Sequence, residues 1–260
     1  MKVVIFAGGL GTRLAEETGT RPKPMVEIGG KPILWHIMKI YEHYGFNEFI
    51  ICLGYKGYMI KEYFMHYYLH NSDLTISVDK NDVKVHYNKS ESFKVTLVDT
   101  GDKTMTAGRL NRVKPYIDDE TFMLTYGDGL SDVNLKDLLH FHYEHGKLAT
   151  LTAIQPEARF GGMEIQENGE VSKFKEKPKG DGAWINGGFF VLNRKIFNYI
   201  DHPDIDTVMW EDMPIEELTK ANELMAFKHE GFWKCMDAMR DKIELERIWS
   251  SNNPKWKLWD

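Results

Sequence analysis

Cysteine is scarce in this sequence: among 260 residues only Cys52 and Cys235 occur, far apart in the chain. They do not form the paired Cys-x-x-Cys spacing of a zinc or redox motif, and two cysteines cannot supply the dense disulfide framework of a small secreted domain. The composition therefore argues against a disulfide scaffold and a structural zinc site. It favours a cytoplasmic protein with two reduced thiols.

Long apolar runs and an excess of basic charge are also missing. The first apolar stretch, residues 3–7, is too short for a signal peptide, and no segment approaches the ~20 apolar residues that span a bilayer. Acidic residues outnumber basic ones by 39 to 33, which gives a net charge of −6. We therefore expect neither a membrane nor a nucleic acid as partner, since nucleic-acid binders carry a basic field.

The first half alternates apolar strand-like runs with helix-like segments. The predicted strands are residues 2–7, 48–53, 95–98 and 121–125, and the predicted helices are 33–44, 57–70, 105–114 and one that follows residue 132 and runs to about residue 145. A hairpin is expected at residues 74–79 and 83–88 around Asn81-Asp82. Asp132 is a candidate N-cap for the fourth helix. This order predicts an α/β fold with a Rossmann-like, doubly wound sheet.

The second half is richer in strands. These are expected at residues 148–155, 162–166, 171–176 and 184–192, with a hairpin turn at Asn168-Gly169, and helices at 194–200, 214–222 and 238–250. No long linker or internal repeat interrupts the chain. We therefore predict one domain over residues 1–260, with a mixed sheet and a β-rich elaboration after about residue 150.

A glycine-rich turn follows the first strand and contains Gly8, Gly9 and Gly11. Several backbone N–H groups of such a turn can point at one phosphate. Arg13 and Lys23 follow and add cations at the same edge of the sheet, where α/β proteins bind ligands. The turn lacks the third glycine of a dinucleotide fingerprint, which is replaced by Leu14, and the Gly-Lys-Ser/Thr of a P-loop.

The segment FAGGLGTRLAEETGTRPKPMVEIGGKPILWH, residues 6–36, resembles the signature of the sugar nucleotidyltransferase family. The resemblance implies a sheet of the nucleotide-diphospho-sugar transferase type. It also implies nucleotide binding by Phe6, Ala7, Gly8, Gly9, Leu10, Gly11, Thr12, Arg13, Lys23, Thr104, Arg109 and Gly127. Arg13 and Lys23 would act in catalysis by neutralising charge on the triphosphate, and Arg109 could donate to a base carbonyl such as O2 of cytosine.

Two aspartates lie in contexts that suit Mg²⁺, which usually needs only one or two carboxylates besides phosphates and waters. Asp128 follows the strand 121–125 within Gly-Asp-Gly, and Asp237 precedes the last predicted helix. Taken alone, Asp128 is a turn residue and Asp237 a helix N-cap. The family resemblance implies that both bind the metal and that Asp128 also acts in catalysis.

Three further segments match the sugar side of the family. They contribute Gly161 in RFG, Glu176 and Lys177 in EKP, and Asn186 and Gly187 in NGG. The resemblance implies that these five residues bind the sugar phosphate. Without it, EKPKGD is a solvated charged loop and the glycine pair is a strand bulge.

Across nearly the full length, the motifs resemble those family members that use CTP and glucose 1-phosphate to make CDP-glucose for the dideoxysugars of bacterial lipopolysaccharide O-antigen. The implied reaction is cytidylyl transfer with release of pyrophosphate, by residues 1–147 mainly for the nucleotide and 148–260 mainly for the sugar and oligomer contacts. UTP or dTTP as the nucleotide remains an alternative, as does a non-catalytic nucleotide-sugar sensor. Relatives of this kind imply a homo-oligomer, and a hexamer is our expectation.

Two other features need an explanation. His140, His142 and His145 do not share one helical face, so we expect an exposed surface rather than a zinc site. Trp256 and Trp259 lie near the C-terminus and need cover, which indicates docking or contacts between subunits.

Overall fold

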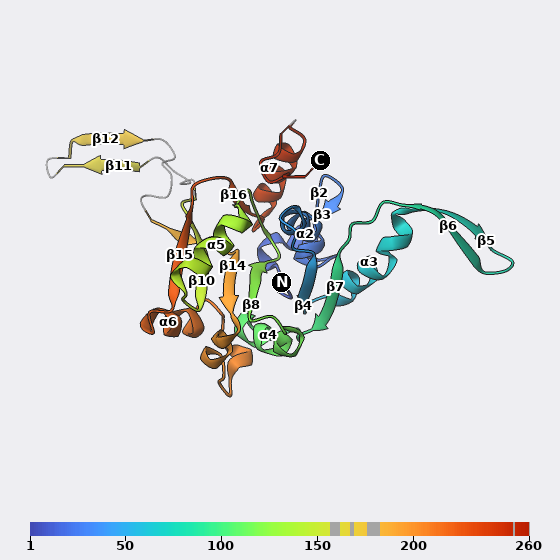
Figure 1. Cartoon of the computed structure of the whole chain (residues 1–260). Coiled ribbons are helices and arrows are strands. Elements are labelled where there is room, and N and C mark those ends of the chain that lie inside the picture. Colours follow the sequence, from blue (N-terminus) through green and yellow to red (C-terminus); the bar gives the residue numbers. More distant parts are fainter. Residues whose placement is uncertain (157–161, 167–168, 176–182, 252, 260) are drawn as a thin grey trace.

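The computed structural model describes residues 1–156, 162–166, 169–175, 183–251 and 253–259. Its central sheet has eight strands in the order β13-β10-β14-β8-β1-β4-β7, with β15 paired to β10 (Figure 1). These strands are β1 (Lys2–Ala7), β4 (Glu48–Leu53), β7 (Lys94–Asp99), β8 (Thr121–Tyr126), β10 (Ala149–Ile154), β13 (Ile185–Asn186), β14 (Phe190–Asn193) and β15 (Leu224–His229).

The N-terminal half of the sheet is parallel. β1 pairs with β4 and with β8, and β4 pairs with β7, all in parallel register. β1, β4 and β8 are almost continuously buried, as expected of apolar strands that are covered on both faces. β14 then inserts antiparallel between β8 and β10, which makes the sheet mixed. The predicted fold class is confirmed.

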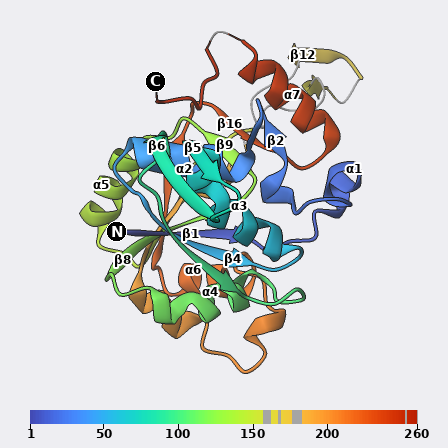
Figure 2. The same ribbon diagram turned by 90° about the vertical axis from the view of Figure 1, so that its right-hand side faces the viewer.

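Helices cover both faces of the sheet, as the view in Figure 2 shows for α2 on one side and α4 with α6 on the other. The first face packs against α2 (Ile33–His43), α3 (Gly57–His70), α5 (Leu135–His145) and α7 (Met239–Trp249). The second face packs against α4 (Thr106–Val113), α6 (Met213–Lys220) and the 3₁₀ helix Arg194–Tyr199. Two apolar cores therefore sandwich the sheet.

Two hairpins extend from this body in Figure 1. One consists of β5 (Ser72–Ser77) and β6 (Asp82–Asn88), which pair antiparallel as predicted. The other consists of β11 (Gly162–Ile165) and β12 (Val171–Lys175), also antiparallel. Gly169 has a φ of 85°, in keeping with the predicted turn, whereas Asn168 lies outside the described residues.

Several short elements occur between the longer strands and helices. They are the 3₁₀ turns Thr12–Leu14 and Lys23–Met25, α1 (Ala15–Thr18), β2 (Glu27–Ile28), β3 (Lys31–Pro32), β9 (Gly129–Ser131) and β16 (Trp233–Cys235). β2 pairs with β3, and β9 pairs with β16.

Two details of the predicted elements were wrong. The strand expected at 184–192 is two strands, because Gly188 and Phe189 have positive φ values of 76° and 46° that break the extended backbone. Asp132 does not cap α5. Asn134 does, by accepting from the N–H groups of Lys136 and Asp137, and Asp132 instead accepts from the Phe232 N–H.

The histidine prediction was wrong for His142, which is buried and bonded at Nδ1 to the Thr150 hydroxyl, 2.8 Å away. His145 bonds the same hydroxyl at 2.7 Å, so a polar strand residue draws these two rings inward. His140 is exposed as expected and pairs with Glu144.

The C-terminal tryptophans find their cover within the chain. Trp256 is fully buried and stacks with Phe232 and Trp249, and Trp259 packs edge-on against Trp35. The indole N–H of Trp256 donates to His36 Nδ1, while His36 Nε2 bonds the Ile28 carbonyl at 2.8 Å. The C-terminal segment is therefore part of the core against α2.

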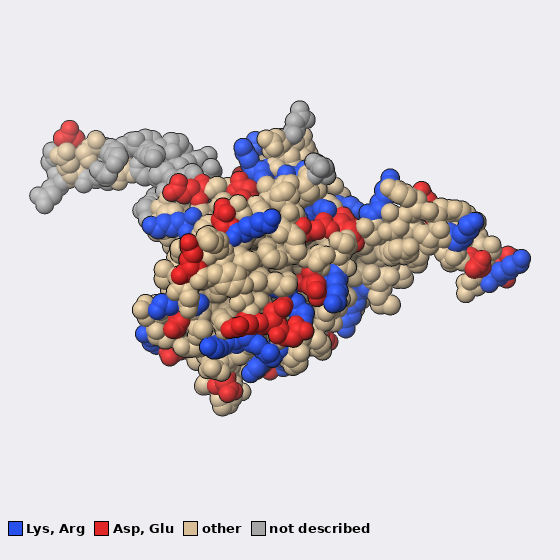
Figure 3. Space-filling view, in the orientation of Figure 1, with Lys and Arg blue, Asp and Glu red and all other residues tan. Residues whose placement is uncertain are grey.

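Across the described residues, no helix combines the length and the apolar character needed to cross a membrane. On the face shown in Figure 3, Lys and Arg side chains are interspersed with Asp and Glu. This pattern accords with the modest net charge of −6.

Candidate functional site

A short strand pair brings Asp128 and Asp237 together from distant parts of the chain. β9 and β16 pair antiparallel with Gly129 opposite Cys235. The next residues outward continue this contact, because the Met236 N–H donates to the Asp128 carbonyl at 2.9 Å. The two aspartates therefore project from neighbouring backbone at the carboxyl end of β8.

Asp237 does not cap α7, since the helix begins at Met239 with Ala238 as its N-cap. Asp241, in the first turn of the helix, instead turns its carboxylate back and accepts from the N–H groups of Asp237 and Ala238, at 3.1 and 2.9 Å. The Asp237 carboxylate is thereby left for the site.

Both predicted cations reach this acidic pair. The Lys23 ammonium lies 2.5 Å from Asp128 Oδ2 and 2.9 Å from Asp237 Oδ1, and Arg13 Nη1 lies 3.2 Å from Asp237 Oδ2. Lys23 starts a 3₁₀ turn between two prolines, which fixes its backbone, while Arg13 lies in the 3₁₀ turn after the glycine loop. The Lys23 side chain is only 14% exposed, whereas that of Arg13 is 76% exposed and therefore accessible to a ligand.

The charges in this cluster reinforce one another. Burial opposes the charged form of Lys23, but the carboxylates of Asp128 and Asp237 outweigh it and raise the pKa of the ammonium. Burial likewise opposes ionisation of Asp237, but hydrogen bonding and charge from Lys23, with the charge of Arg13, lower its pKa. At neutral pH the cluster therefore holds two cations and at least one firmly ionised carboxylate.

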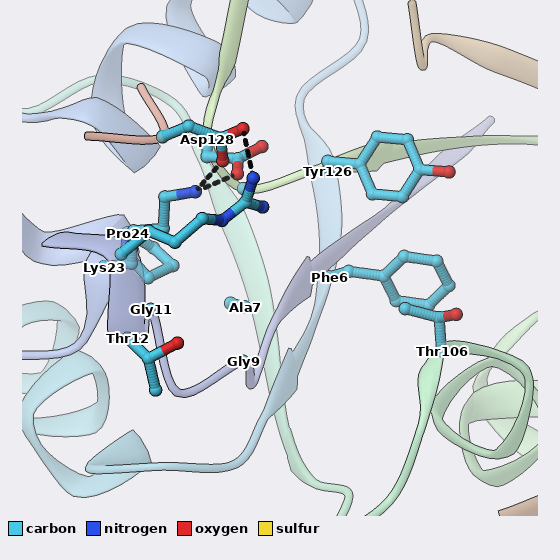
Figure 4. Close-up of a pocket in the computed structure, with 13 residues that line it drawn as sticks. Phe6, Ala7, Gly9, Gly11, Thr12, Lys23, Pro24, Thr106, Tyr126 and Asp128 are labelled. Atoms are coloured by element: carbon cyan, nitrogen blue, oxygen red, sulfur yellow. Dashed lines mark hydrogen bonds and ion pairs between the residues drawn. The ribbon is translucent and has the colours of Figure 1, made fainter. Parts of the chain in front are cut away.

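The four side chains line one end of a pocket of about 240 Å³. Figure 4 shows Lys23 beside Asp128 at this end and Phe6, Tyr126 and Thr106 away from it. Phe6 and Tyr126 form a tilted aromatic pair with ring centroids 6.1 Å apart. The pocket thus joins a charged end to an aromatic and hydroxyl-bearing wall.

The predicted nucleotide-binding residues divide into two groups. Those that line the pocket are Phe6, Ala7, Gly9, Gly11, Thr12, Arg13, Lys23 and Gly127. Gly8, Leu10, Thr104 and Arg109, all described, are not in its lining. Gly11 adopts a left-handed φ of 63°, and its carbonyl accepts from the Thr18 hydroxyl, which fixes the course of the loop.

Arg109 lies beneath the loop rather than open to the pocket. Its guanidinium donates to the carbonyls of Gly8 and Leu53, both at 3.0 Å, and to the Thr100 hydroxyl at 2.7 Å. The residue is 4% exposed. It therefore ties together the ends of β1, β4 and β7, a role that the sequence pattern did not indicate.

Thr106 and Tyr126 line the pocket but were not predicted. The signal for Tyr126 was its position directly after the buried strand 121–125 and before Gly127-Asp128. Thr106 lies inside the segment that contains Thr104 and Arg109, at the first residue of α4.

The predicted sugar-side residues are only partly described. Asn186 lies on β13, its amide donates to the Tyr126 hydroxyl at 3.1 Å, and the Gly187 carbonyl accepts from the Trp233 indole at 2.7 Å. This places Asn186 beside the aromatic wall. Gly161, Glu176 and Lys177 lie outside the described residues.

Comparisons with known proteins agree with this geometry. The profile of the family described as "Nucleotidyl transferase" matches residues 2–245. The chain is 57% identical over 261 residues to the glucose-1-phosphate cytidylyltransferase of Salmonella typhi, and 46% identical over 259 residues to the probable glucose-1-phosphate cytidylyltransferase of Bacillus subtilis. Both matches cover 100% of either chain.

A solved structure is similar as well. HddC from Yersinia pseudotuberculosis superposes with a TM-score of 0.67 at 25% identity, covering 96% of this chain and 99% of its own.

Proposed function

Since this chain belongs to the nucleotidyl transferase family, we propose that it transfers the cytidylyl group of CTP to glucose 1-phosphate, giving CDP-glucose and pyrophosphate. The observation that carries the proposal is the convergence of Lys23, Arg13, Asp128 and Asp237 at one end of a pocket that begins at the glycine loop. The identity of 57% to a full-length cytidylyltransferase supports the choice of both substrates.

The chemistry needs positioning and charge neutralisation more than a protein nucleophile. A phosphate oxygen of glucose 1-phosphate is already anionic, attacks the α-phosphorus of CTP and forms the new P–O bond, while the bond to pyrophosphate breaks. Lys23, the buried cation, would hold the α-phosphoryl oxygens, and the exposed Arg13 would bind the β and γ phosphates that leave. No proton has to be transferred.

We include Mg²⁺ in the proposal, held by Asp128 and Asp237. One oxygen of each carboxylate contacts the same ammonium group, that of Lys23, so the pair can hold one cation between them, as a Mg²⁺ site requires. Within the described ranges no cluster of three or more His, Cys, Asp or Glu residues could hold a metal, so phosphates and waters would supply the other ligands. Bound there, Mg²⁺ would neutralise phosphate charge and orient the leaving group.

We also propose that the two halves of the chain bind different substrates. Residues 1–147 would bind mainly the nucleotide, and residues 148–260 mainly the sugar phosphate, with Gly161, Glu176, Lys177, Asn186 and Gly187 on that side. We further propose that the reaction supplies dideoxysugars for surface polysaccharide and takes place in the cytoplasm.

A product assay tests the proposal. The protein is incubated with Mg²⁺, glucose 1-phosphate and, separately, CTP, UTP, dTTP, ATP or GTP, and the nucleotide sugar is identified by mass. We expect CDP-glucose and pyrophosphate in equal amounts. Faster turnover with UTP or dTTP would reassign the nucleotide, and a lack of product with every nucleotide would favour a non-catalytic sensor.

We also propose that the chain forms a homo-oligomer, as a hexamer, through the β5–β6 hairpin. This arm carries Ile76, Val78, Val83 and Tyr87, which are 46–88% exposed, and in Figure 3 uncharged side chains cover much of it, with charged side chains of both signs near its tip. An isolated two-stranded hairpin is marginally stable in water, so a second copy would complete it. Light scattering after size-exclusion chromatography should give an oligomer, and Val78→Lys should shift it toward smaller species.

A further inference from the structure

Glu211 connects the two hydroxyl-bearing residues of the pocket wall, Thr106 and Tyr126, although it belongs to no sequence motif. Its carboxylate accepts from the Thr106 hydroxyl at 2.9 Å and interacts with the Tyr126 phenol. Thr106 and Tyr126 both line the pocket. The neighbouring Trp210 is fully buried and packs edge-on against Phe190, which fixes the backbone that carries Glu211.

The direction of the hydrogen bond from Thr106 is settled by the backbone. The Trp210 N–H donates to the Thr106 oxygen at 2.7 Å, and an N–H can only donate. The threonine hydrogen is therefore turned toward the Glu211 carboxylate, which can only accept when ionised. One lone pair of the Thr106 oxygen remains unused.

The same logic applies to Tyr126. The Gly188 N–H donates to Asn186 Oδ1 at 2.9 Å, so the other end of this amide, Nδ2, must donate to the Tyr126 oxygen. The Tyr126 oxygen thus already accepts a hydrogen bond from the amide, and the phenol hydrogen is directed to the neighbouring Glu211 carboxylate. Both chains of hydrogen bonds begin at a backbone N–H and end on Glu211.

Because the Thr106 and Tyr126 hydroxyl groups both donate their hydrogen to Glu211, their oxygens can only accept hydrogen bonds from a ligand in the pocket. We infer that Glu211 is a positioning residue for sugar recognition: it holds Thr106 and Tyr126 with their lone pairs directed to the hydroxyl groups of the hexose. A ring hydroxyl can donate to such an oxygen, whereas a deoxy position cannot.

The hexose fits this wall better than the nucleotide does. Tyr126 and Asn186 belong to β8 and β13, whereas the glycine loop and its clamp Arg109 belong to the β1, β4 and β7 side of the sheet. With phosphates at Lys23 and the nucleotide along the glycine loop, the β13 side is left for the ring of the second substrate. This step rests on the proposed function.

The test compares Glu211→Gln with the wild type and with Glu216→Gln, a change at an exposed residue that only pairs with Lys220 on α6. A glutamine amide must donate from one end, so one wall hydroxyl has to turn its hydrogen into the pocket. We expect the KM for glucose 1-phosphate to rise about tenfold, as for the loss of one or two hydrogen bonds, while the KM for CTP changes less than twofold.

A panel of monodeoxy glucose 1-phosphates gives a readout that a merely structural role would not move. The wild type should discriminate against at least one analogue, and Glu211→Gln should reduce that discrimination several-fold. If Glu211→Gln does not fold, Tyr126→Phe serves instead, since it removes one acceptor and leaves Glu211 bonded to Thr106.

The outcomes separate the two claims. A wild-type enzyme that makes no product from CTP and glucose 1-phosphate would overturn the proposed function and this inference with it. An active wild type whose sugar KM and analogue discrimination are unchanged in Glu211→Gln, or whose KM for CTP rises instead, would overturn the inference alone.

Discussion

Asp128 and Asp237 accept hydrogen bonds from the same ammonium group, that of Lys23, at 2.5 and 2.9 Å. The arrangement places one cation between two carboxylates that would otherwise repel each other. It gives Lys23 two functions, as counter-ion of the acidic pair and as partner of an incoming phosphate. A ligand that brings its own cation can release the ammonium toward the phosphate, and the first two predictions follow from this exchange.

Asp128→Asn should lower kcat/KM by roughly 10²–10³, because it removes one charge from the proposed metal site while keeping the side-chain shape. Pyrophosphate release with CTP and glucose 1-phosphate is the measurement, and the melting temperature should stay close to that of the wild type. Asp201→Asn, at an exposed position after the 3₁₀ helix Arg194–Tyr199, is the matched control. Near-normal turnover in Asp128→Asn with Mg²⁺ present would reject the metal assignment.

Lys23→Met should also lower turnover by roughly 10²–10³. In addition it should destabilise the ligand-free protein by about 1–3 kcal/mol, since two partly buried carboxylates lose their shared donor. Mg²⁺ should then raise the melting temperature of Lys23→Met more than that of the wild type. Lys220→Met, at an exposed ion pair, is the control, and an equal response to Mg²⁺ in all three proteins would count against the shared-cation interpretation.

Arg109→Met separates two roles for this guanidinium. If Arg109 holds the ends of β1, β4 and β7 together, its loss should lower the melting temperature and also raise the KM for CTP, because the glycine loop loses its support. A residue that only reads the base predicts weaker CTP binding with stability unchanged. Thermal melts and CTP titrations on the same samples decide between them, and we expect the combined loss.

Acid should destabilise the protein through His36. Burial is the main cause that lowers the pKa of His36 from 6.5 to about 4. A histidine whose pKa is lower in the folded state binds fewer protons there, so its contribution is complete above about pH 6.5 and falls away as the pH drops toward 4. The loss amounts to at most about 3 kcal/mol.

Urea unfolding at pH 7.5, 6 and 5 measures this dependence. His142, whose pKa burial and the charge of His145 also lower to about 4, adds to the same window. His36→Gln should flatten the profile, while His140→Gln, at an exposed side chain, should leave it as in the wild type. A wild-type stability that stays constant between pH 7.5 and 5 would contradict the prediction.

The local pattern of apolar and polar residues was sufficient to predict most strands and helices of the fold. The apolar runs at residues 2–7, 48–53 and 121–125 are strands because nothing polar interrupts them, and the helical segments were found within one or two residues. The single strand expected at 184–192 was not found. The sequence does not show that Gly188 and Phe189 adopt positive φ values, which only the folded backbone reveals.

Long-range partners explain the other differences. Asp132 has the chemistry of a cap, but the Phe232 N–H competes for its carboxylate from a segment far along the chain. Arg109 has the chemistry of a base reader, but the three acceptors that surround it come from strand ends that only the sheet brings together. Glu211 has no motif at all, and its relation to Thr106 exists only in the folded chain.

The contact between β9 and β16 spans three residue pairs, and the Met236 amide closes it against Asp128. Such a small ladder opens at a low free-energy cost compared with the central sheet. A ligand that bridges Asp128 and Asp237 therefore stabilises this ladder. The deuterium uptake of the Met236 amide then reports whether the site is occupied, because exchange slows when ligand bridges the two carboxylates.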